Sequence, residues 1–261
     1  MSLVGEERKK YILHVLDTKG KVKVNSLAEE LKVSTETIRR HLEELEKENK
    51  LKKVYGGAVK ISFEKEEPPY YERSIRYLEE KRKIGQKAAE LIYDNEVIAI
   101  DVGTTTLQII KHLAGKKNLT ILTNSIAVLT ELVDYINKGI FTGKILFIGG
   151  EINTKQLSVS GSISEKFMEN FYIDKAFIAI GGISIDYGIT GYEPNECMLS
   201  KKIIENVKQV IVLSDHSKIG VRNYFQIAKL DDIDVIVCDE AYPIEWEEKL
   251  NYKDVKWITA D

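Results

Sequence analysis

The stretch Val97-Ile98-Ala99-Ile100-Asp101-Val102-Gly103-Thr104-Thr105-Thr106 decides how the larger part of this chain folds. Its apolar, β-branched first half is typical of a strand buried on both faces of a sheet. Helical spacing follows over Leu107–Leu113, so the glycine and the hydroxyls lie on a strand-to-helix turn. The first N–H groups of a helix are unpaired and favour an anion. We therefore predict a phosphate-binding loop; the alternative is that Thr104 or Thr105 only caps the helix.

Length and composition indicate a folded globular protein. The chain has 261 residues, 43% hydrophobic and 30% charged, which is the balance of a globular protein rather than a disordered one. No apolar run reaches membrane-spanning length, and the N-terminus lacks a secretion-signal pattern, so we expect a cytoplasmic location and no membrane partner. Cys197 and Cys238 have no Cys or His at ligand spacing, so we predict no disulfide, metal site or cofactor.

Charge divides the chain into two parts. Residues 1–61 carry 14 Lys+Arg and 10 Asp+Glu, a net charge of +4, whereas the remainder carries 24 and 31, a net charge of −7. Such an asymmetry indicates two domains with different partners.

The first sixty residues contain three helical patterns separated by short breaks. The patterns cover Glu6–Leu16, Leu27–Leu31 and Thr35–Glu48. Ser26 and Glu29 are spaced as a capping box for the second helix, and Ser34 is placed as the cap of the third. Short helices joined by a tight connection are typical of a helix-turn-helix, whose later helix enters the DNA major groove.

The third helix begins with short hydroxyls and two arginines on its exposed face. Hydroxyls reach phosphates or thymine methyl groups, and an arginine can bridge guanine O6 and N7. We assign DNA contacts to Ser34, Thr35, Thr37, Arg39 and Arg40. A charged helical hairpin without a DNA role is the alternative.

A basic hairpin follows the third helix. Two strand-like runs within Leu51–Ile61 flank a Gly-Gly turn and carry several lysines. Such a wing can lie against the phosphate backbone. We assign wing contacts to Lys52, Lys53, Tyr55, Gly56 and Gly57.

These residues carry a family resemblance. The winged helix-turn-helix of the DeoR family of bacterial transcriptional regulators is closely resembled by Arg8, Ile12 and Leu16, followed by Val33-Ser34-Thr35-Glu36-Thr37-Ile38-Arg39-Arg40-His41-Leu42 and Tyr55-Gly56-Gly57-Ala58. The resemblance implies that double-stranded operator DNA is a partner. One departure is His41, where the family usually has an aspartate.

A charged segment with two prolines separates the two parts. Ser62–Pro69 has no apolar period, so we predict an extended tether, with Tyr70, Tyr71 and Arg73 docking it onto the second domain. A charged helix is predicted over Ile75–Tyr93. The expected division is therefore 1–61 for the winged helix-turn-helix, 62–74 for the linker and 75–261 for the second domain.

The second domain repeats a strand, a small polar or glycine-rich tip, and a helix. Further strands are predicted over Leu119–Leu122, Lys144–Ile148, Ala176–Ile180, Gln209–Leu213 and Val235–Val237, and the tips after the first four are Thr123-Asn124-Ser125, Gly149-Gly150, Gly181-Gly182 and Asp215-His216-Ser217-Lys218. This alternation predicts a parallel sheet, and ligands bind outside the carboxyl ends of such strands. The tips should converge on a small-molecule pocket. Individually they could be mere turns and caps.

Lys218 would place a positive charge beside that pocket, where a phosphate needs neutralising. A solvated surface lysine is the alternative.

The second domain also resembles the DeoR-family effector domain, which is similar in fold to ribose-phosphate isomerases and coenzyme A transferases. The loop from Asp101, the tips named above, Gly188-Ile189-Thr190 and Glu196 follow one another in the family's order. The resemblance implies a sensor of a phosphorylated sugar that uses these residues, Glu196 included. Two departures are His216, where many members have a serine, and the segment Tyr192-Glu193-Pro194-Asn195.

Three functions compete at this stage. The leading hypothesis is a repressor of a carbohydrate-metabolism operon, controlled by a phosphorylated sugar, paired as a homodimer or homotetramer and without catalytic residues. A phosphosugar isomerase with an accessory DNA domain is the second, and it needs a general base among Asp101, Glu196, Asp215 and His216. An actin-like sugar kinase is the third, but the residues after Ser74 are too few for its two lobes.

Overall fold

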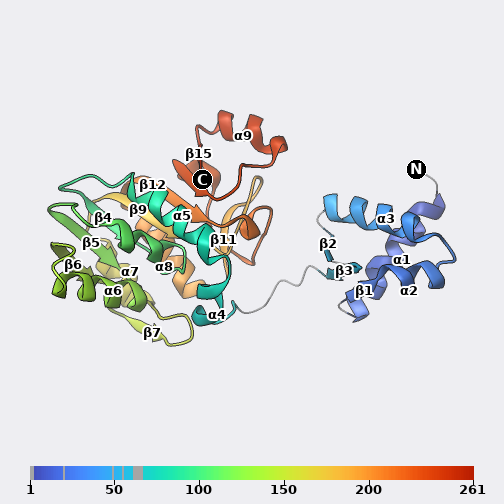
Figure 1. Cartoon of the computed structure of the whole chain (residues 1–261), viewed down its shortest axis with the longest axis horizontal. Helices are drawn as coiled ribbons and strands as arrows, with labels where there is room; N and C mark the ends of the chain where they lie inside the picture. The colour runs from blue at the N-terminus through green and yellow to red at the C-terminus, as the bar shows by residue number, and fades with distance from the viewer. Residues whose placement is uncertain (1–2, 20, 49, 55, 61–66) are drawn as a thin grey trace. The chain divides into compact units, whose positions relative to one another are not determined.

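The computed structural model describes residues 3–19, 21–48, 50–54, 56–60 and 67–261 (Figure 1). Contacts within the chain divide it into two units, Met1–Lys65 and Glu66–Asp261. In the ranges described, no helix is both long enough and apolar enough to cross a bilayer.

The first unit packs three helices against a small antiparallel sheet. Its elements are α1 (Leu3–Lys19), β1 (Lys21–Lys23), α2 (Val24–Glu30), α3 (Thr35–Lys47), β2 (Leu51–Val54) and β3 (Gly57–Lys60), with the sheet order β1-β3-β2. Ile12, Leu27 and Leu42, one from each helix, are buried in a common core. The predicted winged helix-turn-helix is confirmed.

The start of α2 differs from the prediction. The helix begins at Val24 after Lys23, and no side chain caps it, so the predicted capping box of Ser26 and Glu29 is wrong. The unpredicted strand β1 pairs with β3 and runs directly into the helix. The Val24 amide donates to Gly56 O (2.9 Å), so the sheet, rather than a polar side chain, fixes where the helix begins.

The second unit is built on a seven-stranded parallel sheet. Its strands are β4 (Val97–Ile100), β5 (Leu119–Thr123), β6 (Gly143–Phe147), β9 (Ile173–Ala179), β12 (Val207–Ser214), β14 (Val235–Cys238) and β15 (Lys256–Thr259), in the order β15-β14-β12-β9-β4-β5-β6. All six predicted strands lie in this sheet, and every adjacent pair is parallel. The predicted α/β fold class is confirmed.

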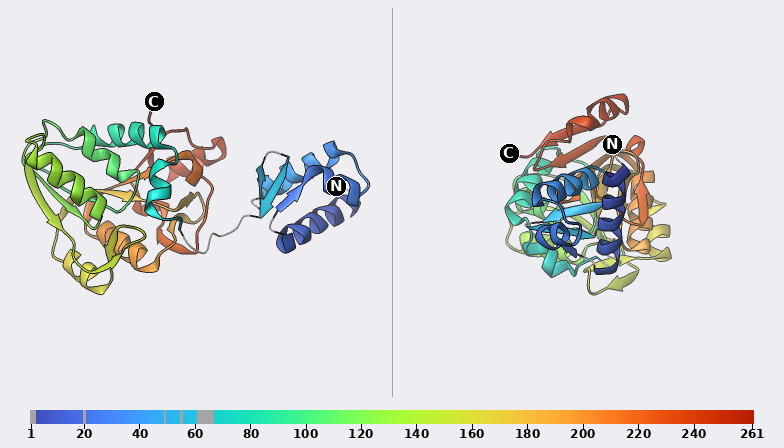
Figure 2. Two further views of the ribbon diagram at one scale, coloured as in Figure 1. Left: turned by 60° about the horizontal axis from the view of Figure 1, so that its bottom comes forward. Right: turned by 90° about the vertical axis from the view of Figure 1, so that its right-hand side faces the viewer.

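Helices cover both faces of the sheet, as Figure 2 shows for the second unit. On one face lie α5 (Leu78–Ala89), η1 (Thr106–His112) and α6 (Ile126–Asn137), and on the other lie α7 (Ser162–Met168), α8 (Pro194–Glu205) and α9 (Glu247–Tyr252). Along β4, Ile98 and Ile100 bury against the first layer and Ala99 against the second. Because side chains alternate along a strand, an apolar run is needed to fill both layers.

Smaller strands and 3-10 turns lie outside the main sheet. They are β7 (Glu151–Asn153), β8 (Ser158–Ser160), β10 (Gly182–Ser184), β11 (Gly188–Gly191) and β13 (Phe225–Ala228), with the 3-10 turns η2 (His216–Lys218), η3 (Leu230–Asp232) and η4 (Ile244–Trp246). β7 pairs with β8, and β11 pairs with both β10 and β13.

The helix predicted over Ile75–Tyr93 is shorter, α5 alone, and a separate short helix precedes it. α4 (Tyr70–Ile75) ends before α5 begins, and Tyr77 between them has φ +52°. The buried Lys81 ammonium donates to the carbonyls of Arg73 (2.6 Å) and Arg76 (2.7 Å). These hydrogen bonds satisfy backbone carbonyls at the end of α4. The helix belongs to the second unit, although its residues before Ile75 were predicted to be part of the linker.

The helix predicted after the Thr104-Thr105-Thr106 turn is a 3-10 helix, η1. The Thr106 hydroxyl donates to Asp101 O (2.8 Å) and Gly103 O (3.1 Å), which keeps the turn tight. α5 also packs closely here, because a Cβ added at Gly85 would lie 2.4 Å from Gln108 Cβ.

The strand order places a topological switch point between β4 and β9. From β4 the chain moves outward through β5 and β6, whereas β9 lies on the other side of β4 and leads to β12, β14 and β15. In parallel sheets the loops diverge at such a point and leave a crevice.

Candidate functional site

A pocket opens at this switch point. Asp101 follows β4, and Gly181 follows β9. Glu196 and Ser200 come from α8, and Arg73 comes from α4. The pocket therefore lies where the strand order predicts a ligand site.

Asp101 forms the base of the pocket and is 2% exposed. One carboxylate oxygen accepts from Ser200 Oγ (2.7 Å) and the other from the Val102 amide (2.8 Å). Burial raises the pKa of Asp101 to about 6, and these two hydrogen bonds oppose the shift. Asn124, which follows β5, is fully buried, and its side-chain amide also opposes the rise in the pKa of Asp101.

Glu196 supplies a second carboxyl group and is 8% exposed. It accepts hydrogen bonds from Ser158 Oγ and from Asn153 Nδ2 (3.4 Å). Burial raises the pKa of Glu196 to about 7, and the charges of Glu67 and Asp101 add to the rise. Asp101 and Glu196 thus offer strong hydrogen-bond acceptors to polar groups of a ligand.

The segment before α5 supplies the opposite charge. Arg73 Nη1 forms an ion pair with Glu67 Oε1 (2.8 Å), and the two side chains are only 15% and 13% exposed. Arg73 also donates to Gln156 Oε1 (2.7 Å) and to Pro68 O (3.1 Å). Contacts with Glu67, Pro68 and Gln156 therefore hold the Arg73 guanidinium at the wall of the pocket.

Two lysines lie close to this segment. Burial lowers the pKa of Lys81 to about 8, the charge of Asp215 opposes that shift, and the charges of Lys218 and Arg73 reinforce it. Lys218 ends η2 and is half-buried. With the other described residues its ammonium forms no hydrogen bond or ion pair, so it can accept an anion without losing an internal partner.

Several predicted site residues stabilise their own loops instead of lining the pocket. Thr123 Oγ1 donates to Ile100 O (2.7 Å), Ser125 caps α6, and Ser217 donates to Asp215. Thr104 and Thr105 are buried beside Thr106. The hydroxyl groups therefore shape the edge of the sheet more than they face the pocket.

The glycine tips differ from one another. Gly181 lines the pocket, and a Cβ there would lie 2.8 Å from the Tyr192 ring. Gly103 allows close packing, since a Cβ added there would lie 2.4 Å from Ala179 Cβ. Gly182 packs against Val221. Gly149-Gly150 is exposed at the end of β6, and neither residue lines the pocket.

The first unit presents its candidate DNA-contact side chains at the start of α3. Ser34 caps the helix by accepting from the Thr37 amide (3.2 Å), as predicted. Arg39 and Arg40 are exposed, and Arg39 lies 3.6 Å from Glu36. Thr35 and Thr37 are half-buried on the same turn.

The hairpin is fixed against α3 and β1. Lys53 donates to Glu43 Oε1 (2.9 Å), and Gly56 has φ +77° at the turn. A Cβ at Gly57 would lie 2.0 Å from Val22 O, so only glycine fits there. Lys52 lies in β2. Tyr55 lies outside the described residues.

Two family models match this chain. A DeoR-like helix-turn-helix domain matches residues 8–64, and a DeoR C terminal sensor domain matches residues 76–240.

The chain belongs to the DeoR family of transcriptional regulators.

Relatives of this DeoR-family protein include the HTH-type transcriptional regulator GolR of Listeria innocua, 32% identical over 89% of this chain and 90% of its own. The HTH-type transcriptional repressor GlcR of Bacillus subtilis is 35% identical over 90% and 88%. Among solved structures, ribose 5-phosphate isomerase A from Methanocaldococcus jannaschii aligns with 55% of each chain, at 16% identity and a TM-score of 0.39. The relatives are named as regulators or repressors rather than enzymes, and the DeoR-family chain is a DNA-binding transcriptional regulator.

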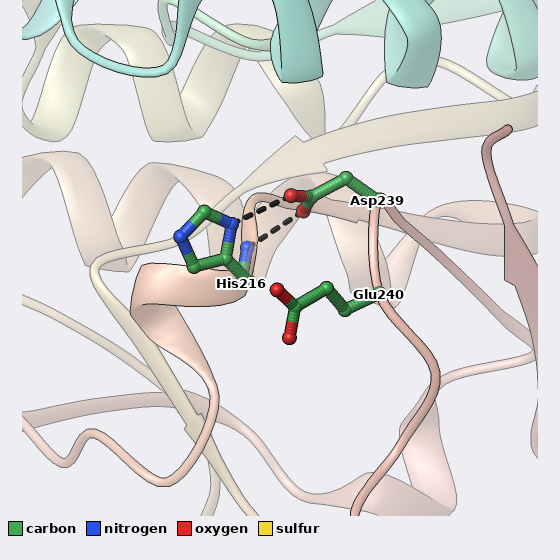
Figure 3. Close-up of side chains that lie close together, drawn as sticks. All are labelled: His216, Asp239 and Glu240. Carbon is green, nitrogen blue, oxygen red and sulfur yellow. Dashed lines mark hydrogen bonds and ion pairs between the residues drawn. The ribbon is translucent and has the colours of Figure 1, made fainter.

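Both histidines that depart from the DeoR-family pattern have defined surroundings. In Figure 3, Asp239 accepts from the His216 amide (2.7 Å) and faces His216 Nδ1 (2.6 Å), with Glu240 beside them. These three residues are close enough to bind a metal ion. Both Asp239 oxygens are already used by His216, however, which favours a hydrogen-bonded pair. Burial lowers the pKa of His41, whose ring nitrogens have no hydrogen-bond partner among the described residues.

Sequence reasoning missed several pocket residues of this DeoR-family chain. They include Glu67 and Ser200, and Arg73 was expected only to dock the linker. Ser200 lies one helical turn after Glu196, a spacing that could have pointed to it. Glu67 lies in a charged run that gives no such signal.

Proposed function

We propose that this regulator is a repressor of a carbohydrate-metabolism operon and that a phosphorylated sugar bound at the β4–β9 switch point controls it. The observation that supports this proposal is the separation of charge in and around the pocket. The carboxyl groups of Asp101 and Glu196 form its inner part, whereas Arg73 and the nearby Lys218 supply positive charge.

Each end of such a ligand has a matching group. Sugar hydroxyls donate to the carboxylates of Asp101 and Glu196 and exchange hydrogen bonds with Ser200, while the phosphate accepts from Arg73 and Lys218. Holding the carboxylates ionised in a buried site is unfavourable, as their raised pKa values indicate. Hydroxyl donors offset that cost, so the pocket favours a polyol over an apolar ligand.

The first unit supplies the DNA contacts. Arg39 and Arg40 reach base edges from α3, and the wing lies along the phosphate backbone. Two winged helices bind two half-sites, so we infer a homodimer or homotetramer that acts on operator DNA in the cytoplasm.

Binding of a panel of sugars, with and without phosphate, tests the proposal. We expect a phosphorylated sugar to raise the melting temperature and to alter a gel-shift complex on the protein's own upstream region. Lys218→Ala should weaken its binding about ten- to a hundredfold, the value of a charge-assisted hydrogen bond.

Lys201→Ala is the matched control, because Lys201 is exposed on α8 and does not line the pocket. The sensing proposal fails if no phosphorylated sugar binds, or if Lys218→Ala and Lys201→Ala bind it equally well.

A further inference from the structure

An acidic side chain of the protein itself occupies the cationic part of the pocket. Glu67 lines the pocket, pairs with Arg73 at 2.8 Å, and its side chain is only 13% exposed. The charge of Lys218 also acts on it, lowering the pKa of Glu67 against the larger rise that burial causes. Glu67 is therefore paired with Arg73 and lies within the electrostatic reach of Lys218, the two cations that the proposed function assigns to phosphate.

The backbone around Glu67 is clamped by the same arginine and by one loop residue. Gln156 Nε2 donates to Glu67 O (3.1 Å) and Pro68 O (3.3 Å), while its Oε1 accepts from Arg73. The Tyr70 amide donates to Lys155 O (3.0 Å) a few residues later. Because Arg73 connects the carboxylate to this clamp, the Glu67–Arg73 pair and the position of the segment depend on each other.

We propose that Glu67 is an internal ligand of the effector pocket and that a bound phosphate displaces it from Arg73, freeing the segment that leads to the DNA-binding unit. The inference rests on the proposed function and adds its regulation. A phosphate dianion carries more charge than one carboxylate and offers more acceptor oxygens, so it competes well for the arginine. Glu67 precedes α4 at the start of the second unit, so its displacement frees the first described residues of that unit.

Inorganic phosphate is a suitable probe, since it carries the competing chemistry without a sugar. Removing the internal carboxylate raises the fraction of pockets open to an anion, and apparent affinity rises in proportion. Full-length Glu67→Gln should therefore bind phosphate on the order of tenfold more tightly than the wild type, measured by calorimetry.

Two control variants separate competition from general charge removal. Glu193 also lines the pocket but has no ion pair with Arg73, so Glu193→Gln should gain much less affinity than Glu67→Gln. Glu72 is an exposed residue of α4 that lies 3.6 Å from Arg76, so Glu72→Gln should bind as the wild type does.

Hydrogen exchange at the Tyr70 amide gives an independent readout of the segment. Phosphate should speed this exchange in the wild type, and Glu67→Gln should show fast exchange without phosphate.

The inference would be overturned if phosphate binding depends on Lys218 but Glu67→Gln does not tighten it, or if Glu193→Gln tightens it equally. Either result would leave the proposed function standing. Absence of Lys218-dependent binding of both phosphate and every sugar phosphate would instead remove the proposed function itself.

Discussion

At the scale of single residues, the buried carboxyl group of Asp101 lowers the stability of the second unit and is available to bind a ligand. It accepts hydrogen bonds from Ser200 Oγ and the Val102 amide, but burial outweighs them. Its pKa rises from 3.8 to about 6. The folded state therefore holds the Asp101 proton more tightly than the unfolded state does.

Asp101→Asn should stabilise the second unit at pH 8. Because the folded-state pKa is raised, the protonated Asp101 carboxyl group contributes its full stability below pH 3.8. This contribution is lost as pH rises through about 6. The variant removes this loss, and we expect a gain of roughly 1 to 3 kcal/mol at pH 8 together with weaker ligand binding. Denaturant unfolding at pH 5 and pH 8 measures the gain, which should be roughly half as large at pH 5. An equal effect at both pH values would contradict the pKa argument.

At the scale of elements, the position of the wing depends on the close approach of β1 and β3. Val22 pairs with Ala58 across the sheet, and the Val22 carbonyl leaves no room for a side chain at Gly57. Gly56, at the turn itself, has open space around it but a left-handed conformation, φ +77°. The two neighbouring glycines are thus needed for different reasons.

Gly57→Ala should destabilise the first unit more than Gly56→Ala. A methyl group at position 57 must displace backbone, at a cost of about 2 to 4 kcal/mol, whereas alanine in the left-handed region at position 56 costs about 1 to 2 kcal/mol. Thermal unfolding followed by circular dichroism gives both values, and operator affinity should fall with the displaced wing. Equal losses for the two variants would show that the Val22 contact does not set the position of the hairpin.

At the scale of the whole molecule, the two units have separate hydrophobic cores. One core contains only residues from Ile12 to Ala58, and the others contain only residues from Ile84 onward. Proteins with independent cores often unfold in more than one step. DNA and effector should therefore stabilise different transitions.

Calorimetric unfolding of the full chain should show two transitions. A phosphorylated sugar at a hundred times its Kd should stabilise the transition of the second unit by about 2.7 kcal/mol, and operator DNA should stabilise the other. The Lys218→Ala variant should lose the response to sugar and keep the response to DNA. A single transition that moves with both ligands would contradict independent units.

Elements with a strong period were predictable from sequence, because local pattern fixes them. The apolar run before Asp101 predicted a strand buried on both faces, and Ser34 predicted the start of α3. β1 was missed because three residues carry no period, and pairing with β3 stabilises it. The break at Tyr77 was missed because hydrogen bonds from the Lys81 ammonium to the carbonyls of Arg73 and Arg76 stabilise it, and the sequence pattern does not reveal them.

The sequence by itself determined the class of this protein: a winged helix-turn-helix followed by a parallel α/β domain, since periodicity and turn chemistry act over a few residues. Only the tertiary structure decided which side chains share the pocket. Arg73 meets Gln156 across 83 positions, and Ser200 meets Asp101 across 99. No local pattern encodes such pairs, because folding, and not spacing along the chain, brings them within hydrogen-bond distance.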